Sequence, residues 1–190
     1  MAAVSFHRLT ADDLPRLHRW LHDPAVVAWW EGDDVSWPAV VRDYGEDEVA
    51  EHWVASHDGA PLGWIQCYPA DHPEALEETA LWAPHLPLET TAGIDYLIGE
   101  PSARGRGLGA AMIRAFVGGV VFAQHPAWTH AAAGPFEANV ASCKALARAG
   151  LRRVARLDDE DGPCLLFAAT RGELGGGELG SRDGRAGRRP

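Results

Sequence analysis

The sequence predicts a single-domain α/β fold in which helices flank a mixed, mostly antiparallel sheet. The chain has 190 residues, of which 46% are hydrophobic and 23% charged, and these values are ordinary for one globular domain. Segments with the two-residue period of strands alternate with segments that carry helix start and stop signals. One pair of strand-like segments is also joined by a hairpin turn. Together these observations exclude fibrous and wholly disordered chains.

The first quarter of the chain is predicted to form one strand followed by three helices. Residues 4–9 alternate between apolar and polar side chains, which is typical of a strand. The helices are expected at residues 10–22, 24–30 and 36–44, because each stretch opens with a capping residue, a proline or both.

A hairpin and a long insertion follow. Residues 49–56 and 62–68 alternate as strands, and Asp58-Gly59 between them is a strong signal for a tight hairpin turn. Residues 69–91 are rich in Pro, Glu and Trp and show no clear period. They predict a long loop or irregular insertion, and loops of this length are usually functional or disordered.

The second half is predicted to alternate between strands and helices. The expected elements are a strand at 94–98, a helix at 107–124, a strand at 128–133, a helix at 138–149 ended by Gly150, and strands at 152–157 and 164–170. The complete order is β-α-α-α-β-β-loop-β-α-β-α-β-β, which a mixed sheet flanked by helices accommodates.

The last residues differ in composition from the rest. Residues 172–190 are rich in Gly and Arg and almost lack apolar side chains. Such a segment cannot offset its ordering entropy by burial. We therefore predict a folded domain at residues 1–171 and a disordered tail at residues 172–190.

Composition also bears on the compartment and on metal binding. The N-terminus carries charge where a signal peptide would be apolar, and no apolar run has the length of a membrane span. We therefore expect a cytoplasmic protein without a membrane partner. We expect it to be a monomer or a homodimer. Cys67, Cys143 and Cys164 follow no metal-ligand spacing and suit free thiols. His18 and His22 share a helix face without a third ligand nearby, so we expect no metal ion.

The net charge indicates the kind of partner. The chain carries 17 basic and 27 acidic residues, a formal charge of −10. Residues 171–190 contain five Arg and three acids, so the remainder carries −12. This sign disfavours nucleic acid and favours a cationic small molecule or basic peptide. The alternative is that the acidic residues serve only to keep the protein soluble. The acidic stretches at residues 31–34, 46–48 and 71–78 are expected to face such a partner.

A glycine-rich turn carries most of the chemical information. In Arg104-Gly-Arg-Gly-Leu-Gly109, free backbone N–H groups at the start of a helix predict a site for phosphate or pyrophosphate. The nucleotide P-loop pattern is absent. The dinucleotide fingerprint needs an acidic residue about 20 positions later, and no acid occurs between Glu100 and Glu137.

The turn resembles a known cofactor motif. Arg104, Gly107 and Gly109 match the pattern [Q/R]-x-x-G-x-[G/A] of the GCN5-related N-acetyltransferase (GNAT) superfamily. Further segments, including Gly93-Ile-Asp95 and the Ala149-Gly150 helix end, look like the aminoglycoside 6′-N-acetyltransferase branch over roughly residues 4–172. Siderophore-associated lysine N-acyltransferases share this extended pattern, so the resemblance defines the branch better than the acceptor.

The resemblance implies a GNAT-like fold and acetyl-CoA as co-substrate, with no metal. The backbone at the end of the strand predicted at residues 94–98 would pair with the pantetheine arm. The glycine-rich turn at residues 104–109 would hold the pyrophosphate. The residues that the resemblance assigns to cofactor binding are Leu97, Ile98, Arg104, Gly105, Arg106, Gly107, Leu108, Gly109, Ala110 and Asn139.

The resemblance also assigns residues to the acceptor side. Asp95 matches the family aspartate that contacts the substrate amine and is the expected catalytic base. Asp71 and Glu78 match the family's acidic substrate loop. Trp29 and Trp30 are candidate walls of a sugar-binding cleft, although paired tryptophans at a helix end also pack in cores.

One departure from the family pattern leaves alternatives open. The family commonly has a Tyr that protonates the leaving thiolate, where this chain has Leu146, and an Asp-Pro pair where it has Gly134-Pro135. The sequence therefore predicts an N-acetyltransferase acting on a cationic amine, with an aminoglycoside 6′-amine as first choice. The alternatives are a lysine N-acyltransferase of the siderophore type, or a CoA-binding accessory module without turnover.

Overall fold

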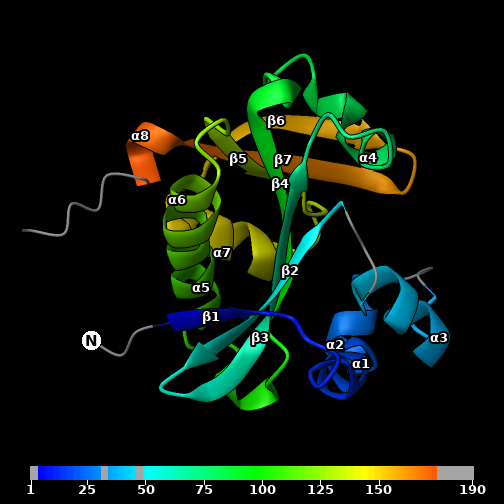
Figure 1. The fold of residues 1–190 in the computed structure, drawn as a ribbon. Helices are drawn as coiled ribbons and strands as arrows, with labels where there is room; N and C mark the ends of the chain where they lie inside the picture. The colour runs from blue at the N-terminus through cyan, green and yellow to red at the C-terminus, as the bar shows by residue number, and fades with distance from the viewer. Residues whose placement is uncertain (1–3, 31–33, 46–48, 175–190) are drawn as a thin grey trace, which may run out of the picture.

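A computed structural model of the chain describes residues 4–30, 34–45 and 49–174. Seven strands form one sheet in the order β1-β2-β3-β4-β5-β7-β6 (Figure 1). The strands are β1 Val4–Arg8, β2 Glu51–His57, β3 Ala60–Pro69, β4 Thr91–Leu97, β5 His130–Ala133, β6 Arg152–Asp159 and β7 Gly162–Thr170. Only the β4–β5 pair is parallel, which confirms the predicted mixed, mostly antiparallel sheet.

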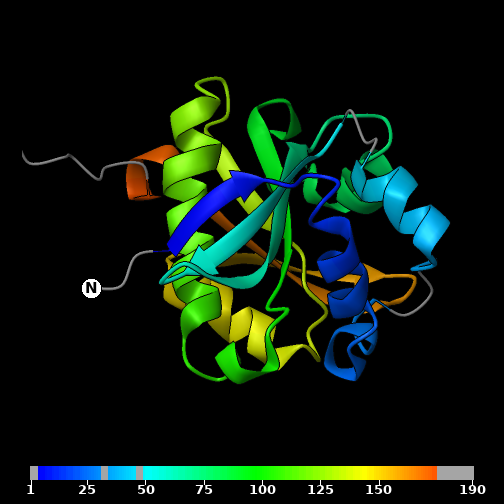
Figure 2. The same ribbon diagram turned by 60° about the horizontal axis from the view of Figure 1, so that its bottom comes forward.

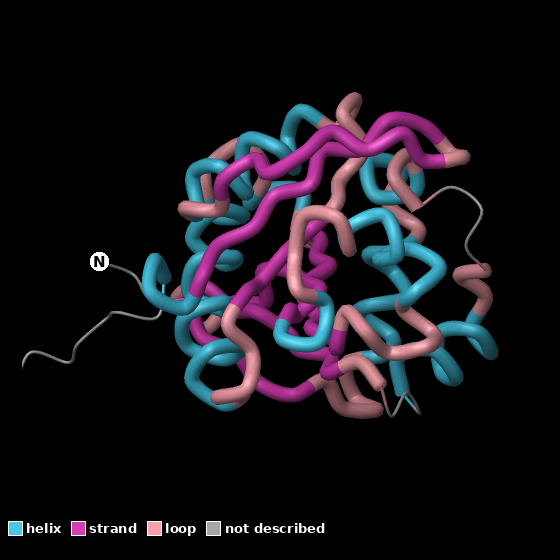
Figure 3. Tube along the Cα trace, turned by 90° about the horizontal axis from the view of Figure 1, so that it is seen from above, coloured by secondary structure: helices cyan, strands magenta, loops and turns pink. Residues whose placement is uncertain are grey.

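Helices cover both faces of this sheet. They are α1 Leu14–Leu21, α2 Pro24–Val27, α3 Trp37–Val40, α4 Leu76–Thr79, α5 Leu108–Phe116, α6 Phe122–Gln124, α7 Val140–Ala149 and α8 Arg171–Leu174. In Figure 2, α1, α2 and α3 lie on one side of the central strands, and α5 and α7 lie on the other. The view from above shows helical segments on both sides of the strands (Figure 3). The predicted order of elements is confirmed.

Two of the predicted boundaries near the N-terminus are wrong. Helix α1 begins at Leu14 and not at Thr10, because the Asp13 carboxylate accepts hydrogen bonds from the backbone N–H and the hydroxyl of Thr10. These bonds fix a turn before the helix. Helix α2 ends at Val27, so Trp29 and Trp30 lie beyond it.

The insertion between β3 and β4 is more ordered than expected. It contains α4 and two short 3-10 turns, and the Trp82 side chain is buried within it. Strand β4 begins at Thr91, three residues before the predicted start. The Thr79 hydroxyl donates a hydrogen bond to the Ala70 carbonyl, which ties the insertion to the end of β3. Local sequence period did not reveal these contacts.

The predicted hairpin is confirmed. Asp58 and Gly59 have φ angles of 52° and 78°, the left-handed pair that suits a right-twisted two-residue turn. This turn sets the register of β3, in which alternate side chains point to opposite faces. Ile65 and Cys67 therefore enter the main core, whereas Trp64 enters a second one.

Three apolar clusters pack against the sheet in the described part of the chain, and the two larger ones hold α5 and α1. The larger lies under α5, whose Met112, Ile113 and Phe116 are fully buried at the helical spacing that puts them on one face. The smaller packs Leu17 and Trp20 of α1 against strands of the other face. The sheet is thereby fixed from both sides, which positions the residues along β3 and β4.

The described structure continues past residue 171, the predicted domain end. Helix α8 includes Gly172, Glu173 and Leu174, and Leu174 packs against the main core. The Arg171 guanidinium donates hydrogen bonds to the backbone carbonyls of Phe122, His125 and Trp128. The remainder of the predicted tail, residues 175–190, lies outside the described residues.

No helix in the described part of the chain is both long enough and apolar enough to cross a membrane.

Candidate active site

The sheet opens between β4 and β5. The parallel ladder contains three pairs and ends at Gly93↔Ala132, whereas β4 continues to Leu97. Among the described residues, the last four of β4 therefore have no β5 partner on that edge. On its other edge Leu97 pairs with Trp64 of β3. Backbone groups on an open strand edge can bind an extended amide-containing chain.

The glycine-rich turn follows this open edge. Gly105 and Gly107 have φ angles of 72° and 80°, where a residue with a Cβ atom is strained. Gly107 directly precedes α5, and the first N–H groups of a helix have no partner within it. Leu108, Gly109 and Ala110 supply these groups, which form a site suited to a phosphate.

Arg104 has a structural role in the described structure. Its guanidinium donates hydrogen bonds to the carbonyl oxygens of Ile98 (3.0 Å) and Gly99 (3.3 Å) and to Asp23 Oδ1 (2.8 Å). This bond from Arg104 holds the pKa of Asp23 below its usual value. The resemblance assigns Arg104 to cofactor binding, and in the described structure its side chain is used in these contacts. They join the N-terminal helices to the end of β4, whereas Arg106 is exposed.

Asp95 lies halfway along β4, on the face opposite the main core. Its cross-strand partner is Gln66, whose side-chain amide donates a hydrogen bond of 2.8 Å to Asp95 Oδ2. The Tyr68 hydroxyl also hydrogen-bonds Asp95. Gly93 makes this possible, since a Cβ atom there would lie 2.3 Å from the Tyr68 ring. The carboxylate is thus oriented by two neighbours from β3.

The Tyr68 hydroxyl stays protonated in this environment. Burial raises its pKa well above the usual value, and the nearby charges of Asp95 and Glu78 raise it further. A protonated Tyr68 donates to the Asp95 carboxylate, which acts as the acceptor.

The predicted acceptor residues are only partly brought together. Glu78 on α4 is exposed, and its charge acts on the same Tyr68 hydroxyl as that of Asp95. Asp71 is exposed in the turn after β3. Trp30 packs against the smaller core, which favours the packing role, while Trp29 is 37% exposed. Of the predicted acidic stretches, residues 31–33 and 46–48 lie outside the described residues.

Helix α7 places the remaining predicted residues. Asn139 caps the helix, with Oδ1 accepting a hydrogen bond from the Ser142 N–H at 3.1 Å. Leu146 is fully buried in the main core and offers no proton. Tyr96 of β4 and Ser142 share a hydrogen bond of 2.7 Å between their hydroxyls, so β4 is tied to α7 behind Asp95.

Sequence reasoning missed Gln66 and Tyr68. Both lie in a strand that was correctly predicted, and the two-residue period puts them on one face. Their approach to Asp95 depends on the β3–β4 register, which connects residues 29 positions apart and carries no local signal. Gly93 was the available hint, because a glycine inside a strand often marks a close approach of another group.

A family model matches most of this chain. Residues 10–159 match the model described as "Acetyltransferase (GNAT) domain". The matched region includes the open edge of β4, Asp95, the glycine turn and α7.

Named relatives and solved structures agree with this match. The chain is 27% identical over 175 residues to aminoglycoside N(6′)-acetyltransferase type 1 of Klebsiella pneumoniae, covering 89% of this chain and 84% of the relative, and the same values hold for that of Serratia marcescens. A structure of AAC(6′)-Ib with paromomycin and acetyl-CoA superposes with a TM-score of 0.78 at 25% identity, covering 94% of this chain and 99% of that one. A coenzyme A complex of the same enzyme gives 0.76 at 26%, covering 90% and 96%.

Proposed function

Since this chain belongs to the GNAT acetyltransferase family, we propose that it transfers the acetyl group of acetyl-CoA to the 6′-amino group of an aminoglycoside. The relatives carry that name, and a similar solved structure, that of AAC(6′)-Ib, contains coenzyme A together with kanamycin. The cationic acceptor agrees with the acidic balance of the chain, −10 at neutral pH.

The observation that carries the proposal is the position of Asp95. Its carboxylate lies on β4 next to the point where β5 diverges, and it is oriented by Gln66 and Tyr68. An acyl donor held along the open edge would bring its thioester next to this carboxylate. An acetyl transfer to an amine needs one proton acceptor at this place.

The proposed acetyl transfer needs few protein groups. The Asp95 carboxylate binds the substrate ammonium and accepts its proton, directly or through one water. The freed nitrogen lone pair forms the bond to the thioester carbonyl carbon, the nitrogen releases its second proton to solvent, and the carbon–sulfur bond breaks. The products are the amide, the free thiol of CoA after it takes up a proton, and one proton that leaves Asp95.

The donor would be held mostly by backbone groups. The edge of β4 near Leu97 and Ile98 offers its amides to the pantetheine arm, although the Ile98 carbonyl is already bonded to Arg104. The N–H groups at the start of α5 would bind the pyrophosphate. Asn139 retains its amide N–H₂ for the CoA arm because only Oδ1 is used in capping.

The leaving thiolate is handled without the family Tyr. Leu146 occupies that place, and it is buried among apolar side chains. A thiol with a pKa near 8.5 leaves readily as the anion, so the thiolate takes its proton from solvent after the bond has broken. The loss of the acid limits the rate of this step and leaves the acetyl transfer itself possible.

The acceptor would enter over the insertion and the α1–α2 side. Glu78 is near enough to act on the same hydroxyl as Asp95, and we assign it to a second amine of the acceptor. Asp71 is a less direct candidate because it lies in the exposed turn after β3. Exposed Trp29 is the available aromatic surface for a sugar ring.

The test is thiol release from acetyl-CoA with aminoglycosides, lysine derivatives and basic peptides as separate acceptors. We expect turnover with aminoglycosides. Turnover only with lysine derivatives would transfer the chain to the lysine N-acyltransferases. Saturable CoA binding without release of thiol on any amine would make it an accessory module.

A further inference from the structure

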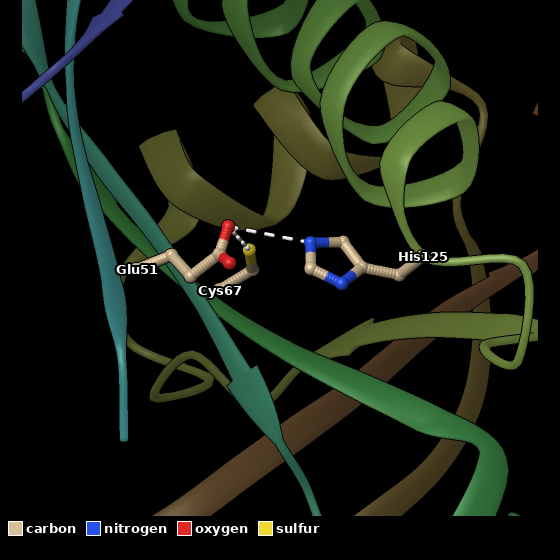
Figure 4. Close-up of side chains that lie close together, drawn as sticks. All are labelled: Glu51, Cys67 and His125. Atoms are coloured by element: carbon tan, nitrogen blue, oxygen red, sulfur yellow. Dashed lines mark hydrogen bonds and ion pairs between the residues drawn. The ribbon is translucent and has the colours of Figure 1, made fainter. Parts of the chain in front are cut away.

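Three side chains with metal-ligating atoms meet on the far side of the sheet from Asp95. Glu51 of β2, Cys67 of β3 and His125, which follows α6, point toward one another (Figure 4). One oxygen of Glu51, the sulfur of Cys67 and a ring nitrogen of His125 all lie within 4.8 Å of one another. Cys67 is fully buried, whereas the other two are half-buried.

The sheet and its neighbours hold the three side chains in this arrangement. Glu51 and Cys67 are direct cross-strand partners, so both side chains point to the same face. The His125 ring lies against Trp128, with ring centres 4.1 Å apart. The His125 carbonyl is also fixed, since it accepts a hydrogen bond of 2.6 Å from Arg171.

The two oxygens of the Glu51 carboxylate have different partners. Its Oε1 pairs with the Arg8 guanidinium at 2.7 Å. Its Oε2 faces the other two donors, 3.9 Å from Cys67 Sγ and 3.3 Å from His125 Nε2. A charged group that binds the outer oxygen of a ligand carboxylate is the usual arrangement around a metal centre, because it orients the ligand.

The separations agree with the size of a tetrahedral site. With metal–sulfur bonds of about 2.3 Å and metal–nitrogen or metal–oxygen bonds of about 2.1 Å, neighbouring ligand atoms in a tetrahedron lie about 3.4–3.6 Å apart. The separations of 3.3 Å and 3.9 Å bracket this value. The third separation, between the Cys67 sulfur and a ring nitrogen of His125, is within 4.8 Å.

We propose that Glu51, Cys67 and His125 bind one zinc ion, with water as the fourth ligand. A set of thiolate, imidazole and carboxylate suits zinc better than calcium or magnesium, which prefer oxygen ligands. On binding, the Cys67 thiol releases its proton to solvent and no electron is transferred. The ion links β2, β3 and the end of α6.

This site braces the strand that carries the partners of Asp95. Cys67 lies between Gln66 and Tyr68 along β3, and its side chain points to the opposite face. A zinc ion would therefore stabilise the fold without touching the acetyl-transfer site. The competing explanation is a hydrogen-bonded network in which the Cys67 thiol donates to Glu51 and no ion is bound.

The experiment titrates Co²⁺ and then Zn²⁺ into the metal-free full-length chain. We expect one Co²⁺ per chain with a thiolate-to-cobalt absorption band in the near ultraviolet, displacement by Zn²⁺, and a rise in melting temperature with Zn²⁺. Cys67→Ser and His125→Gln should each weaken binding about tenfold or more. Cys143→Ser and His130→Gln are the matched controls and should bind as the parent does.

Two results would contradict the proposed zinc site. One is the absence of a thiolate-to-cobalt band in the parent chain, and the other is equal metal affinity in the parent and in Cys67→Ser. Melting of each metal-free variant shows whether it folds. If Cys67→Ser does not fold, His125→Gln decides, because this half-buried side chain lies at the edge of the core and its replacement keeps a hydrogen-bonding group.

Discussion

At the scale of single residues, the structure explains why an aspartate stands in the middle of a strand. Asp95 is satisfied by Gln66 and Tyr68, and the space for the Tyr68 ring exists because residue 93 is glycine. Asp95 was predicted from the family resemblance. Its partners were not, because cross-strand neighbours depend on register. The Arg104 contacts with Asp23 were also unpredictable, as they connect residues 81 positions apart.

The first residue-scale prediction concerns Asp95→Asn. The amide keeps the shape of the carboxylate but cannot take the proton of the substrate amine, so kcat should fall about 100-fold or more. The affinity for CoA, measured by calorimetry, should stay within about twofold because the cofactor site does not use this side chain. Asp161→Asn, in the exposed β6–β7 turn, is the matched control. An unchanged kcat for Asp95→Asn would remove this residue from the mechanism.

The second residue-scale prediction concerns pH and Asp13. Burial raises the pKa of this carboxyl, but hydrogen bonds from Thr10 and His7 outweigh burial and hold the pKa below its ordinary value of 3.8. The ionised group therefore stabilises the fold above pH 3.8, and this contribution is lost as the pH falls through the folded-state pKa.

Asp13→Asn should accordingly lower the free energy of unfolding by about 1–3 kcal/mol at pH 7. The difference from the parent chain should shrink as the pH is lowered below about 4. Urea unfolding at several pH values measures both quantities. A difference that stays constant from pH 7 to pH 3 would show that the charge of Asp13 does not contribute.

At the scale of elements, the glycine-rich turn before α5 and the open edge of β4 together form the proposed acetyl-CoA site. The order of helices and strands was predictable because caps, turns and periods are local signals. The helical turns of the insertion were not, because Trp82 and Thr79 are held by tertiary contacts. The gap between β4 and β5 also had no local signal, as it results from where a parallel ladder ends.

The element-scale prediction concerns Gly107→Val. Gly107 has a φ of 80°, and a residue with a Cβ atom there costs about 1–2 kcal/mol, with a β-branched residue costing more. Relief of this strain would move the N–H groups at the start of α5, so the affinity for acetyl-CoA should fall about tenfold or more. Isothermal calorimetry measures it.

Gly119→Ala provides the comparison, since Gly119 lies in the same long helical segment, its φ is not left-handed, and an added Cβ meets no atom within 4 Å. It should leave the affinity for acetyl-CoA unchanged. If Gly107→Val also binds acetyl-CoA as the parent does, the assignment of the pyrophosphate to this turn is wrong.

At the scale of the whole molecule, α8 packs against the rest of the described fold. Arg171 donates to three backbone carbonyls near the end of α6, and Leu174 packs on the main core. The predicted boundary at residue 171 came from composition, which changes at Gly172. The contacts of a Gly-rich segment depend on the one or two side chains that pack against the core. The overall composition of the segment does not reveal these single residues.

Two truncations test this boundary. Stopping after Leu174 should leave the melting temperature unchanged. Stopping after Thr170 removes the hydrogen bonds of Arg171, worth about 1.5–3 kcal/mol, and should lower the melting temperature by roughly 3–12 °C. Equal melting temperatures for the two truncated chains would mean that α8 does not stabilise the fold.

The central claim is that this fold acetylates the 6′-amine of an aminoglycoside, and it is tested most directly by a matched pair of acceptors. Thiol release from acetyl-CoA is measured with an aminoglycoside that has a 6′-amino group and with one that has a 6′-hydroxyl group but is otherwise equivalent. We predict turnover with the first and none with the second, and a product of the first that carries one acetyl group at the 6′-nitrogen. Equal turnover with both acceptors, or none with either, would contradict the claim.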